Sequence, residues 1–195
     1  MFPQPIQNLI NQLSQLPDIG PRAATRLVFY LINQEQKDLD EMSLSIKELK
    51  TKIHLCPQCF SIAVKNNQLC SICQDKKRDN QTICVVENVL SIPPIEKTKQ
   101  YHGLYHVLGG LISPTNGLGP EKLRINELIK RAKNSQEIIF ALSPTTEGDT
   151  TFLYIERLLK PLKIKTTRLG RGLSIGSDLE YVDENTLTSA LLGRK

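Results

Sequence analysis

Four cysteines in two close pairs constrain this chain more than any other feature of its sequence. Cys56 and Cys59 form the first C-x-x-C pair, Cys70 and Cys73 form the second, and ten residues separate the pairs. Each pair places two thiolates on one side of a tight turn, so that two pairs supply four sulfurs for a tetrahedral zinc site. Such a shell leaves no open coordination position. We therefore expect one structural Zn²⁺ per chain, whose binding energy folds a segment without a core of its own.

Other interpretations of these cysteines remain open, namely two redox pairs, an iron–sulfur centre or a fortuitous grouping. The first residues, Met1 to Gln4, lack the basic and apolar regions of a signal peptide, so we expect a cytoplasmic protein. Disulfides are rare in that compartment, which favours metal binding. The fifth cysteine, Cys84, lies in an apolar run and is expected in the core. We expect His54 to be solvated, because four sulfurs already complete the metal shell.

Length and composition exclude several classes of protein. The chain has 195 residues, which corresponds to one or two domains at roughly 150 residues per domain. Hydrophobic residues make up 39% and charged residues 23%, a balance that argues against wholesale disorder. There is no apolar run of the length that a membrane-spanning helix needs. The net charge of +5 is compatible with a nucleic-acid partner without establishing one.

The apolar pattern changes after the cysteine segment. Before it, helical spacing predicts helices over 4–16, from Pro21 onward and over 38–51, the last with one apolar face of Leu39, Met42, Ile46 and Leu49. After it, buried-strand patterns alternate with helical ones, which predicts a parallel sheet with right-handed crossovers. The expected strands are 82–86, 138–142 and 164–169, the expected helices are 121–133, 149–160 and 184–192, and 101–120 is expected to be irregular with one short strand.

The turn between the first two helices has the pattern of a helix-hairpin-helix motif. It reads Leu16-Pro17-Asp18-Ile19-Gly20-Pro21-Arg22. A tight turn of this kind exposes backbone N–H groups at a helix N-terminus, which attract a phosphate. Arg22 and Arg26 lie four residues apart on the second helix, so both can reach the backbone of one duplex. The motif usually has Gly where Asp18 stands, and an ordinary helix turn with two solvated arginines is the alternative.

Three acidic residues follow predicted strands. Glu87 ends the first strand, and Glu147 and Asp149 lie in the turn after the second. The carboxyl ends of parallel strands are where open α/β sheets build their sites, and carboxylates there can hold Mg²⁺. The arrangement looks like that of Toprim domains, in which such groups position metal for phosphoryl transfer. The alternative is a solvated acidic loop in which Asp149 caps a helix.

In their order, these parts resemble the RecR family of bacterial recombination mediators over nearly the whole chain. The matching stretches are 16–26, the four cysteines, 83–87, 103–110, 113–114, 144–148, 167–168 and 178–181. Departures from the family pattern are Asp18 for Gly, Ser143 for Asn, Ser91 for Asp, Pro93-Pro94 in a helix, and Gly170-Arg171 for a small residue and His.

The resemblance implies a fold, partners and residue roles. The expected modules are a helix-hairpin-helix region (1–53), a four-cysteine zinc finger (54–75), a Toprim-like α/β domain (80–176) and a C-terminal tail that promotes oligomerisation (177–195). Members form ring-like tetramers that can encircle DNA, and act with RecO and RecF to load RecA on gapped DNA. Arg22 and Arg26 match DNA-contacting positions. Glu87, Glu147 and Asp149 match the Toprim acidic positions, for Mg²⁺ or for a partner protein.

Three functional hypotheses follow. The leading one is a non-enzymatic DNA-repair mediator that forms a zinc-stabilised oligomeric clamp, because a small protomer needs several copies to surround a duplex. The second is a Toprim-type, Mg²⁺-dependent nuclease or other phosphoryl-transfer enzyme. The third is a zinc-containing interaction scaffold whose DNA affinity is incidental. The absence of the G-x-x-x-x-G-K-[ST] pattern argues against ATP hydrolysis by this chain.

Overall fold

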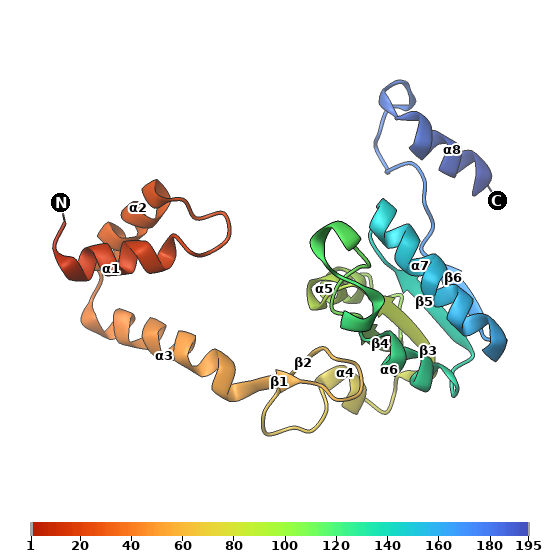
Figure 1. The fold of residues 1–195 in the computed structure, drawn as a ribbon, viewed down its shortest axis with the longest axis horizontal. Helices are drawn as coiled ribbons and strands as arrows, with labels where there is room; N and C mark the ends of the chain where they lie inside the picture. Colours follow the sequence, from red (N-terminus) through yellow and green to blue (C-terminus); the bar gives the residue numbers. More distant parts are fainter. Residues whose placement is uncertain (1, 195) are drawn as a thin grey trace. The chain divides into compact units, whose positions relative to one another are not determined.

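The chain divides into two compact units, Met1–Ile53 and His54–Lys195. The structure is a computed structural model that describes residues 2–194 (Figure 1). The first unit is helical. The second contains the cysteine segment, a parallel sheet with its covering helices, and a C-terminal helix. The architecture is therefore the mixed α/β arrangement that the sequence predicts.

The N-terminal unit is built on a pair of helices. α1 (Gln4–Leu13) and α2 (Pro21–Ile32) pack through a small core of Ile10, Ala24 and Val28. α1 ends three residues before the predicted boundary at 16, because the turn toward Gly20 begins at Ser14. α2 begins at Pro21, whose missing N–H costs nothing in the first helical turn.

The third helix, α3 (Gln36–Lys52), buries none of its side chains. Its predicted apolar face is present in the sequence but uncovered in the single chain, since Met42, Ile46 and Leu49 are 46–60% exposed. An apolar stripe of this kind normally lies against another element. Within residues 2–53, no other element of the N-terminal unit buries it.

A small module holds the cysteines. β1 (Ile53–Leu55) and β2 (Ile62–Val64) form a two-stranded sheet, and α4 (Ser71–Gln74) follows. Its interior is a cluster of Cys56, Cys59, Cys70 and Ala63. Such an interior is too small to hold a fold by apolar burial alone.

A four-stranded sheet forms the centre of the second unit. β3 (Asp79–Val86) lies between β4 (Gly103–Val107) and β5 (Glu137–Ala141), and β6 (Lys165–Arg168) completes the order β4-β3-β5-β6. All three pairings are parallel, as predicted. β4 and β6 are therefore the edge strands, and β3 is central.

Alternate residues of β3 face two cores. Ile83 and Val85 pack with residues of α6 (Ile125–Ala132) and α7 (Thr146–Leu159). Cys84 and Val86 pack with α5 (Ile92–Lys97) and with residues of the cysteine module. Cys84 is buried as expected, and burial raises its pKa to about 12, which keeps the thiol protonated.

The connections include several short turns of 3-10 helix. η1 (Val89–Ser91) leads into α5, and Pro93-Pro94 fall in the first turn of that helix, where proline is tolerated. The predicted irregular stretch 101–120 contains β4 and η2 (Pro114–Asn116). The predicted helix 121–133 is shorter, because η3 (Pro120–Lys122) precedes α6. The predicted helix 149–160 begins earlier, at Thr146, and η4 (Lys160–Leu162) follows it.

Residues 169–194, called the C-terminal segment below, leave the sheet after β6. They contain η5 (Leu179–Tyr181) and α8 (Glu184–Leu192), and α8 matches the predicted terminal helix. The segment projects from the sheet domain in Figure 1 and exposes large apolar side chains, among them Ile175, Tyr181 and Leu192. No helix within residues 2–194 is long and apolar enough to cross a membrane.

Candidate functional site

The four cysteines converge in one place. One ligand atom from each of Cys56, Cys59, Cys70 and Cys73 lies within 4.8 Å of the others. A tetrahedral zinc–thiolate site with bonds of about 2.3 Å has sulfur–sulfur edges of about 3.8 Å, so the cluster has the size that such a site requires. Within residues 2–194 this is the one group of three or more His, Cys, Asp or Glu side chains that is arranged to hold a metal ion.

The environment of the sulfurs also fits a cation. Three of the cysteines are buried, and all are free of disulfides. Cys59 Sγ lies 3.4 Å from Cys70 Sγ. Hydrogen bonding to Cys59 and Cys73 lowers the pKa of Cys70, whereas the pKa of Cys59 is raised by its contact with Cys70. Four sulfurs this close, three of them buried, cannot all carry a negative charge without a cation, and a bound divalent metal ion would supply the charge that allows four thiolates.

One neighbour of this module differs from the expectation of a solvated side chain, and a second is solvated only in part. His54 is not freely solvated: its Nε2 lies 3.4 Å from the Gln68 carbonyl, and its Nδ1 is buried without a hydrogen-bond partner within the described part of the chain. The run Lys76-Lys77-Arg78 is not uniformly solvated either. Arg78 forms an ion pair with Glu96 and its side chain is only 16% exposed, whereas Lys76 and Lys77 are exposed.

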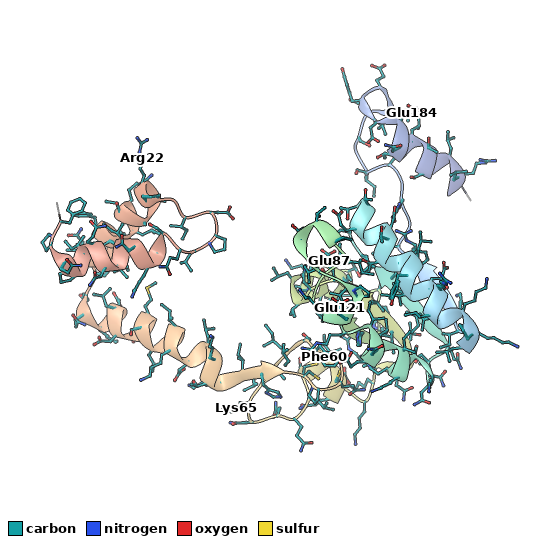
Figure 2. All side chains as sticks on the ribbon, in the orientation of Figure 1. Arg22, Phe60, Lys65, Glu87, Glu121 and Glu184 are labelled. Atoms are coloured by element: carbon teal, nitrogen blue, oxygen red, sulfur yellow. The ribbon has the colours of Figure 1, made fainter. Side chains whose placement is uncertain are left out.

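The helix hairpin presents the geometry that its sequence predicts. Gly20 caps α2 with an extended backbone, and Arg22 and Arg26 are both exposed on that helix (Arg22 is labelled in Figure 2). Asp18 has a φ of +62°, in the left-handed region that glycine enters without strain. This explains why Gly is usual at that position of the motif. It also places a carboxylate in the turn that precedes the two arginines.

Glu87 and Glu147 line one pocket of about 300 Å³ beside Gly110 and Ser113. Glu87 Oε1 accepts a hydrogen bond of 2.9 Å from the hydroxyl of Ser143. Ser143 therefore donates a hydrogen bond to the carboxylate that follows the central strand. The asparagine that is usual at this position could donate the same bond. Two of the three predicted acidic residues are therefore brought together at the carboxyl ends of the strands.

Asp149 is held elsewhere. Its carboxylate forms ion pairs with Arg168 at the end of β6 and with Arg171 in the C-terminal segment. Hydrogen bonds from Arg171 and Arg168 lower the pKa of Asp149 to about 2. Asp149 is not the cap of α7, because Thr145 accepts the capping hydrogen bond from the Gly148 N–H. The three carboxylates do not form a shared cation site in this arrangement.

Gly148 is required by a close approach in the same turn. A Cβ atom at this position would lie 1.9 Å from the Ser143 carbonyl oxygen. The first turn of α7 can therefore reach the loop after β5 only because residue 148 has no side chain. This approach sets Glu147 on the pocket side of the turn.

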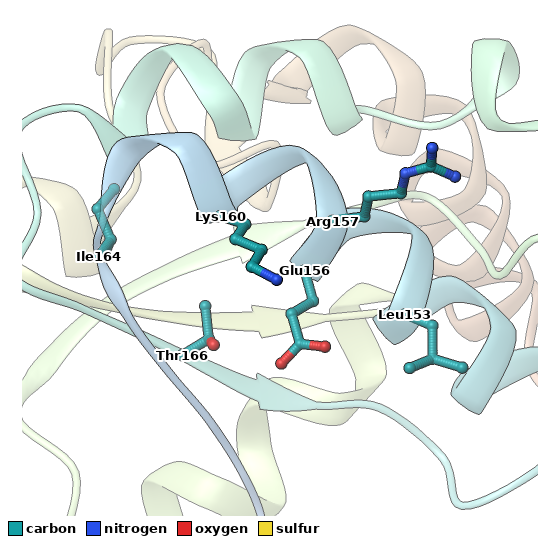
Figure 3. Close-up of a pocket in the computed structure, with 6 residues that line it drawn as sticks. All are labelled: Leu153, Glu156, Arg157, Lys160, Ile164 and Thr166. Carbon is teal, nitrogen blue, oxygen red and sulfur yellow. The ribbon is translucent and has the colours of Figure 1, made fainter.

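A further pocket, of about 420 Å³, lies between α7 and β6 (Figure 3). It contains none of the site residues that the sequence predicts. Exposed and partly exposed side chains of a helix and of the chain that follows it line this pocket: Leu153, Glu156, Arg157, Lys160, Ile164 and Thr166. We assign it no role in binding.

Sequence reasoning missed the residues that attach the cysteine module to the sheet. Phe60 packs against His106 with a ring-centroid separation of 5.4 Å, and the Arg124 guanidinium lies 4.4 Å from the Phe60 ring centroid. Arg131 is half-buried and donates a hydrogen bond of 2.9 Å to the Tyr105 carbonyl. No spacing pattern in the sequence marks these residues. A phenylalanine directly after one of the four clustered cysteines is the one visible hint.

A helix hairpin, a four-cysteine site and a Toprim-type parallel sheet with paired carboxylates define a multi-module protein of nucleic-acid transactions. The family models agree with this class: "RecR, helix-hairpin-helix" matches residues 6–50, "Toprim domain" matches 81–170, and "RecR, C-terminal" matches 172–195.

Curated relatives extend the match to the full chain. "Recombination protein RecR" of Staphylococcus aureus (strain MRSA252) is 46% identical over 99% of this chain and 98% of its own length. The protein of the same name from Gloeothece citriformis (strain PCC 7424) is 45% identical over 100% of this chain and 98% of its own length. The chain belongs to the RecR family of recombination proteins.

Proposed function

We propose that this protein is a non-enzymatic, DNA-binding mediator of recombinational repair. The full-length match to RecR proteins, together with two exposed arginines beside the hairpin turn, carries the proposal. A RecR-like mediator acts with RecO and RecF to promote RecA loading on gapped DNA. We propose four functional modules: the helix-hairpin-helix region (1–53), the zinc finger (54–75), the Toprim-like domain (80–176) and the C-terminal tail (177–195). We also propose that the protein is located in the cytoplasm.

Phosphate contacts from the hairpin account for DNA binding. The α2 N-terminus offers free backbone N–H groups, and the nearby Arg22 and Arg26 add two positive charges on the same helix. Contacts of this type read the backbone and carry no sequence information. A mediator that acts at any gap needs this indifference to sequence.

The cysteine cluster is proposed to hold one Zn²⁺ through Cys56, Cys59, Cys70 and Cys73. Bound zinc would link β1, β2 and α4, and so supply the folding energy that the small interior of the module lacks. A closed shell of four sulfurs gives the ion a structural role. Zinc content near one per chain, measured on protein purified without added metal, is the expected result.

Self-association is proposed from the uncovered apolar surface. The α3 stripe of Met42, Ile46 and Leu49 is exposed, and so are Ile175 and Leu192 in the C-terminal segment. Large exposed apolar patches mark interaction sites. We propose that the partner is a second copy of the chain, because the resemblance to RecR implies ring-like tetramers. The α3 stripe and the C-terminal segment are two separate surfaces, and two surfaces per chain allow a closed assembly such as a tetramer.

The Glu87–Glu147 pocket is proposed as the contact for a partner protein or for Mg²⁺. Two half-buried carboxylates can bind either a hydrated cation or the basic side chains of RecO or RecF. Asp149 is engaged by two arginines and takes no part in this proposal.

Salt-dependent binding to gapped DNA tests the mediator proposal. The double variant Arg22→Ala with Arg26→Ala should weaken binding equally for all sequences and lower the salt slope by about one per lost phosphate contact. Lys37→Ala is the matched control, because it removes one exposed cation of the same unit outside the hairpin. Unchanged affinity in the double variant would remove the hairpin from the mechanism.

A Toprim-type, Mg²⁺-dependent nuclease is the second candidate, because Glu87 and Glu147 share a pocket at the carboxyl ends of the strands. Pure protein incubated with labelled gapped DNA and Mg²⁺ decides between the two. We expect no cleavage. Cleavage that is lost in Glu87→Gln would overturn the non-enzymatic proposal.

A further inference from the structure

β4 is an edge strand of the parallel sheet, yet its outer edge is covered. The Val107 N–H points away from β3 and donates a hydrogen bond of 2.8 Å to the Cys59 carbonyl. The Tyr105 carbonyl accepts from Arg131 at 2.9 Å, and the Gly103 carbonyl accepts from Arg78 at 3.1 Å. An open strand edge carries unpaired backbone groups that must be satisfied or shielded. Here the residue that satisfies the Val107 N–H is one of the four clustered cysteines.

Phe60 fixes the cysteine module on one face of this strand. It has a φ of +62°, a left-handed conformation that is strained for a residue with a β-carbon. The turn sets the aromatic ring edge-on to His106 and beneath the Arg124 guanidinium. His106 is fully buried, and its Nε2 lies 2.8 Å from the Arg124 carbonyl. Figure 2 shows Phe60 where the cysteine module meets the sheet domain.

The module also reaches the opposite face of the strand. Ile72 of α4 and Phe60 pack against the core cluster that contains Tyr105 and Val107. His106 points to one side of β4, and Tyr105 and Val107 point to the other. The cysteine module therefore wraps the edge of β4 and contacts both of its faces.

The covered end of β4 leads directly into the acidic pocket. Leu108 N donates to the Val86 carbonyl at 2.9 Å, and Gly109 N donates to the Glu87 carbonyl at 3.0 Å. The next residue, Gly110, lines the pocket with Glu87 and Glu147. One residue, Leu108, thus separates Val107, which bonds to Cys59, from Gly109, which bonds to the backbone of Glu87. Gly109 and Gly110 both have positive φ, so this loop has a backbone path that few other residues could follow.

We propose that the cysteine module is a metal-dependent cover for the β4 edge, and that metal occupancy controls the order of the 107–112 loop and hence the shape of the Glu87–Glu147 pocket. This inference rests on the proposal that the four cysteines hold a metal ion. It goes beyond a local structural role for that ion. A metal-free module loses the constraint on Cys59 and Phe60, which leaves the Val107 N–H without its partner.

Hydrogen exchange on the full chain tests the proposal. Zinc-loaded protein is compared with protein stripped by a chelator, after zinc content has been measured. Amides of 105–112 should exchange about tenfold faster without metal, which corresponds to the loss of one or two hydrogen bonds. Amides of 138–141 in β5 should change by much less. Zinc added back should restore protection of 105–112.

A variant that still binds the metal distinguishes loss of the cover over the β4 edge from general unfolding of the cysteine module. Phe60→Leu retains all four cysteines and an apolar side chain but removes the ring that contacts His106 and Arg124. It should bind zinc fully and still show faster exchange at 105–112. Val64→Ala is the control, because Val64 is 58% exposed in the same module and should leave that exchange unchanged.

Three results would overturn the proposal. The first is unchanged exchange at 105–112 after zinc removal. The second is an equal rise in β4 and β5, which would show that the metal supports the whole domain rather than one edge. The third is the absence of zinc from the purified protein, which would also end the metal assignment itself. The first two results leave the DNA-mediator function intact.

Discussion

Arg171 holds the carboxylate of Asp149, with Nη1 3.3 Å from Oδ2, and thereby ties the start of the C-terminal segment to the first turn of α7. Arg168, the last residue of β6, binds the same carboxylate and stacks 4.4 Å from the Phe152 ring centroid. One acidic residue thus connects a helix, a strand end and the exit of the C-terminal segment. Arg171 departs from the usual histidine of the family, and its guanidinium binds both oxygens of this carboxylate.

Removing this connection should loosen the C-terminal segment. We expect Arg171→Ala to increase the rate of proteolytic cleavage within 170–178, and Asp149→Asn to do the same. The free energy of unfolding should change by only ~0.2–1 kcal/mol, since the ion pairs are partly exposed. Arg157→Ala, on the exposed surface of α7, is the control. A cleavage rate equal to that of the parent chain would show that the segment is held by other contacts.

The same connection should be insensitive to mild acid. The pKa of Asp149 is lowered to about 2 in the folded chain, so its ionic contribution is present above its unfolded pKa near 4 and is lost as the pH falls toward 2. Limited proteolysis with an acid-tolerant protease at pH 5 and pH 3 checks this. Protection of 170–178 should persist at pH 5 and decline at pH 3.

His106 should make the sheet domain sensitive to a higher pH range. Burial lowers the pKa of His106 to about 4, and the facing cations Arg124 and Arg131 act in the same direction. The unfolded chain binds a proton near pH 6.5, so the stability that comes from a neutral His106 is complete above pH 6.5 and falls as the pH drops toward 4. The full loss is ~3 kcal/mol at 1.36 kcal/mol per pKa unit.

Denaturant unfolding between pH 7.5 and pH 4.5 measures this effect. His106→Gln keeps a side chain that can donate to the Arg124 carbonyl but cannot take up a proton. The variant should be less stable at pH 7.5 and should lose less stability than the parent as the pH falls. Parallel pH profiles for parent and variant would contradict the assignment.

Asp18 has two unfavourable features, its positive φ and its negative charge beside the proposed DNA contact. Two variants distinguish the effects of these features. Asp18→Asn removes the carboxylate from the turn but keeps a side chain that tolerates positive φ. It should bind gapped DNA more tightly, most clearly at low salt. Asp18→Gly should bind as the Asn variant does, with a melting temperature that changes little, because glycine relieves the turn but costs more entropy on folding. Equal affinity in all three proteins would place the DNA path away from the turn.

The ion pair of Arg78 and Glu96 should contribute more than the surface pairs. The Arg78 side chain is 16% exposed, and Glu96 also accepts a hydrogen bond of 2.6 Å from the Tyr105 hydroxyl. Hydrogen bonding to Arg78 lowers the pKa of Glu96. We expect Glu96→Gln to reduce the free energy of unfolding by ~1–3 kcal/mol, against less than 1 kcal/mol for Glu137→Gln, whose partner Lys165 is exposed.

Periodic and spaced features of the sequence predict the longer helices, the strands of the parallel sheet and the cysteine cluster, but not β1, β2, α4 or α5. The β3 run from Ile83 to Val86 and the two C-x-x-C pairs are local patterns, and local patterns survive folding. The pairing of Asp149 with arginines was not predictable, because Arg168 and Arg171 approach it only after β6 is placed beside β5. The position of Phe60 depends on its positive φ. Phenylalanine rarely adopts this conformation, so the sequence gives no indication of it.

The exposed stripe on α3 has a consequence for the protein at low concentration. A helix of 17 residues that buries nothing is only marginally stable in water by itself. In the proposed assembly, a second copy covers Met42, Ile46 and Leu49 and so supplies the contacts that keep the helix folded. Dilution then weakens the helix and the assembly together. The concentration of the protein in the cell would then determine the fraction of chains that are folded and assembled for DNA binding. No ligand or modification would be needed for this control.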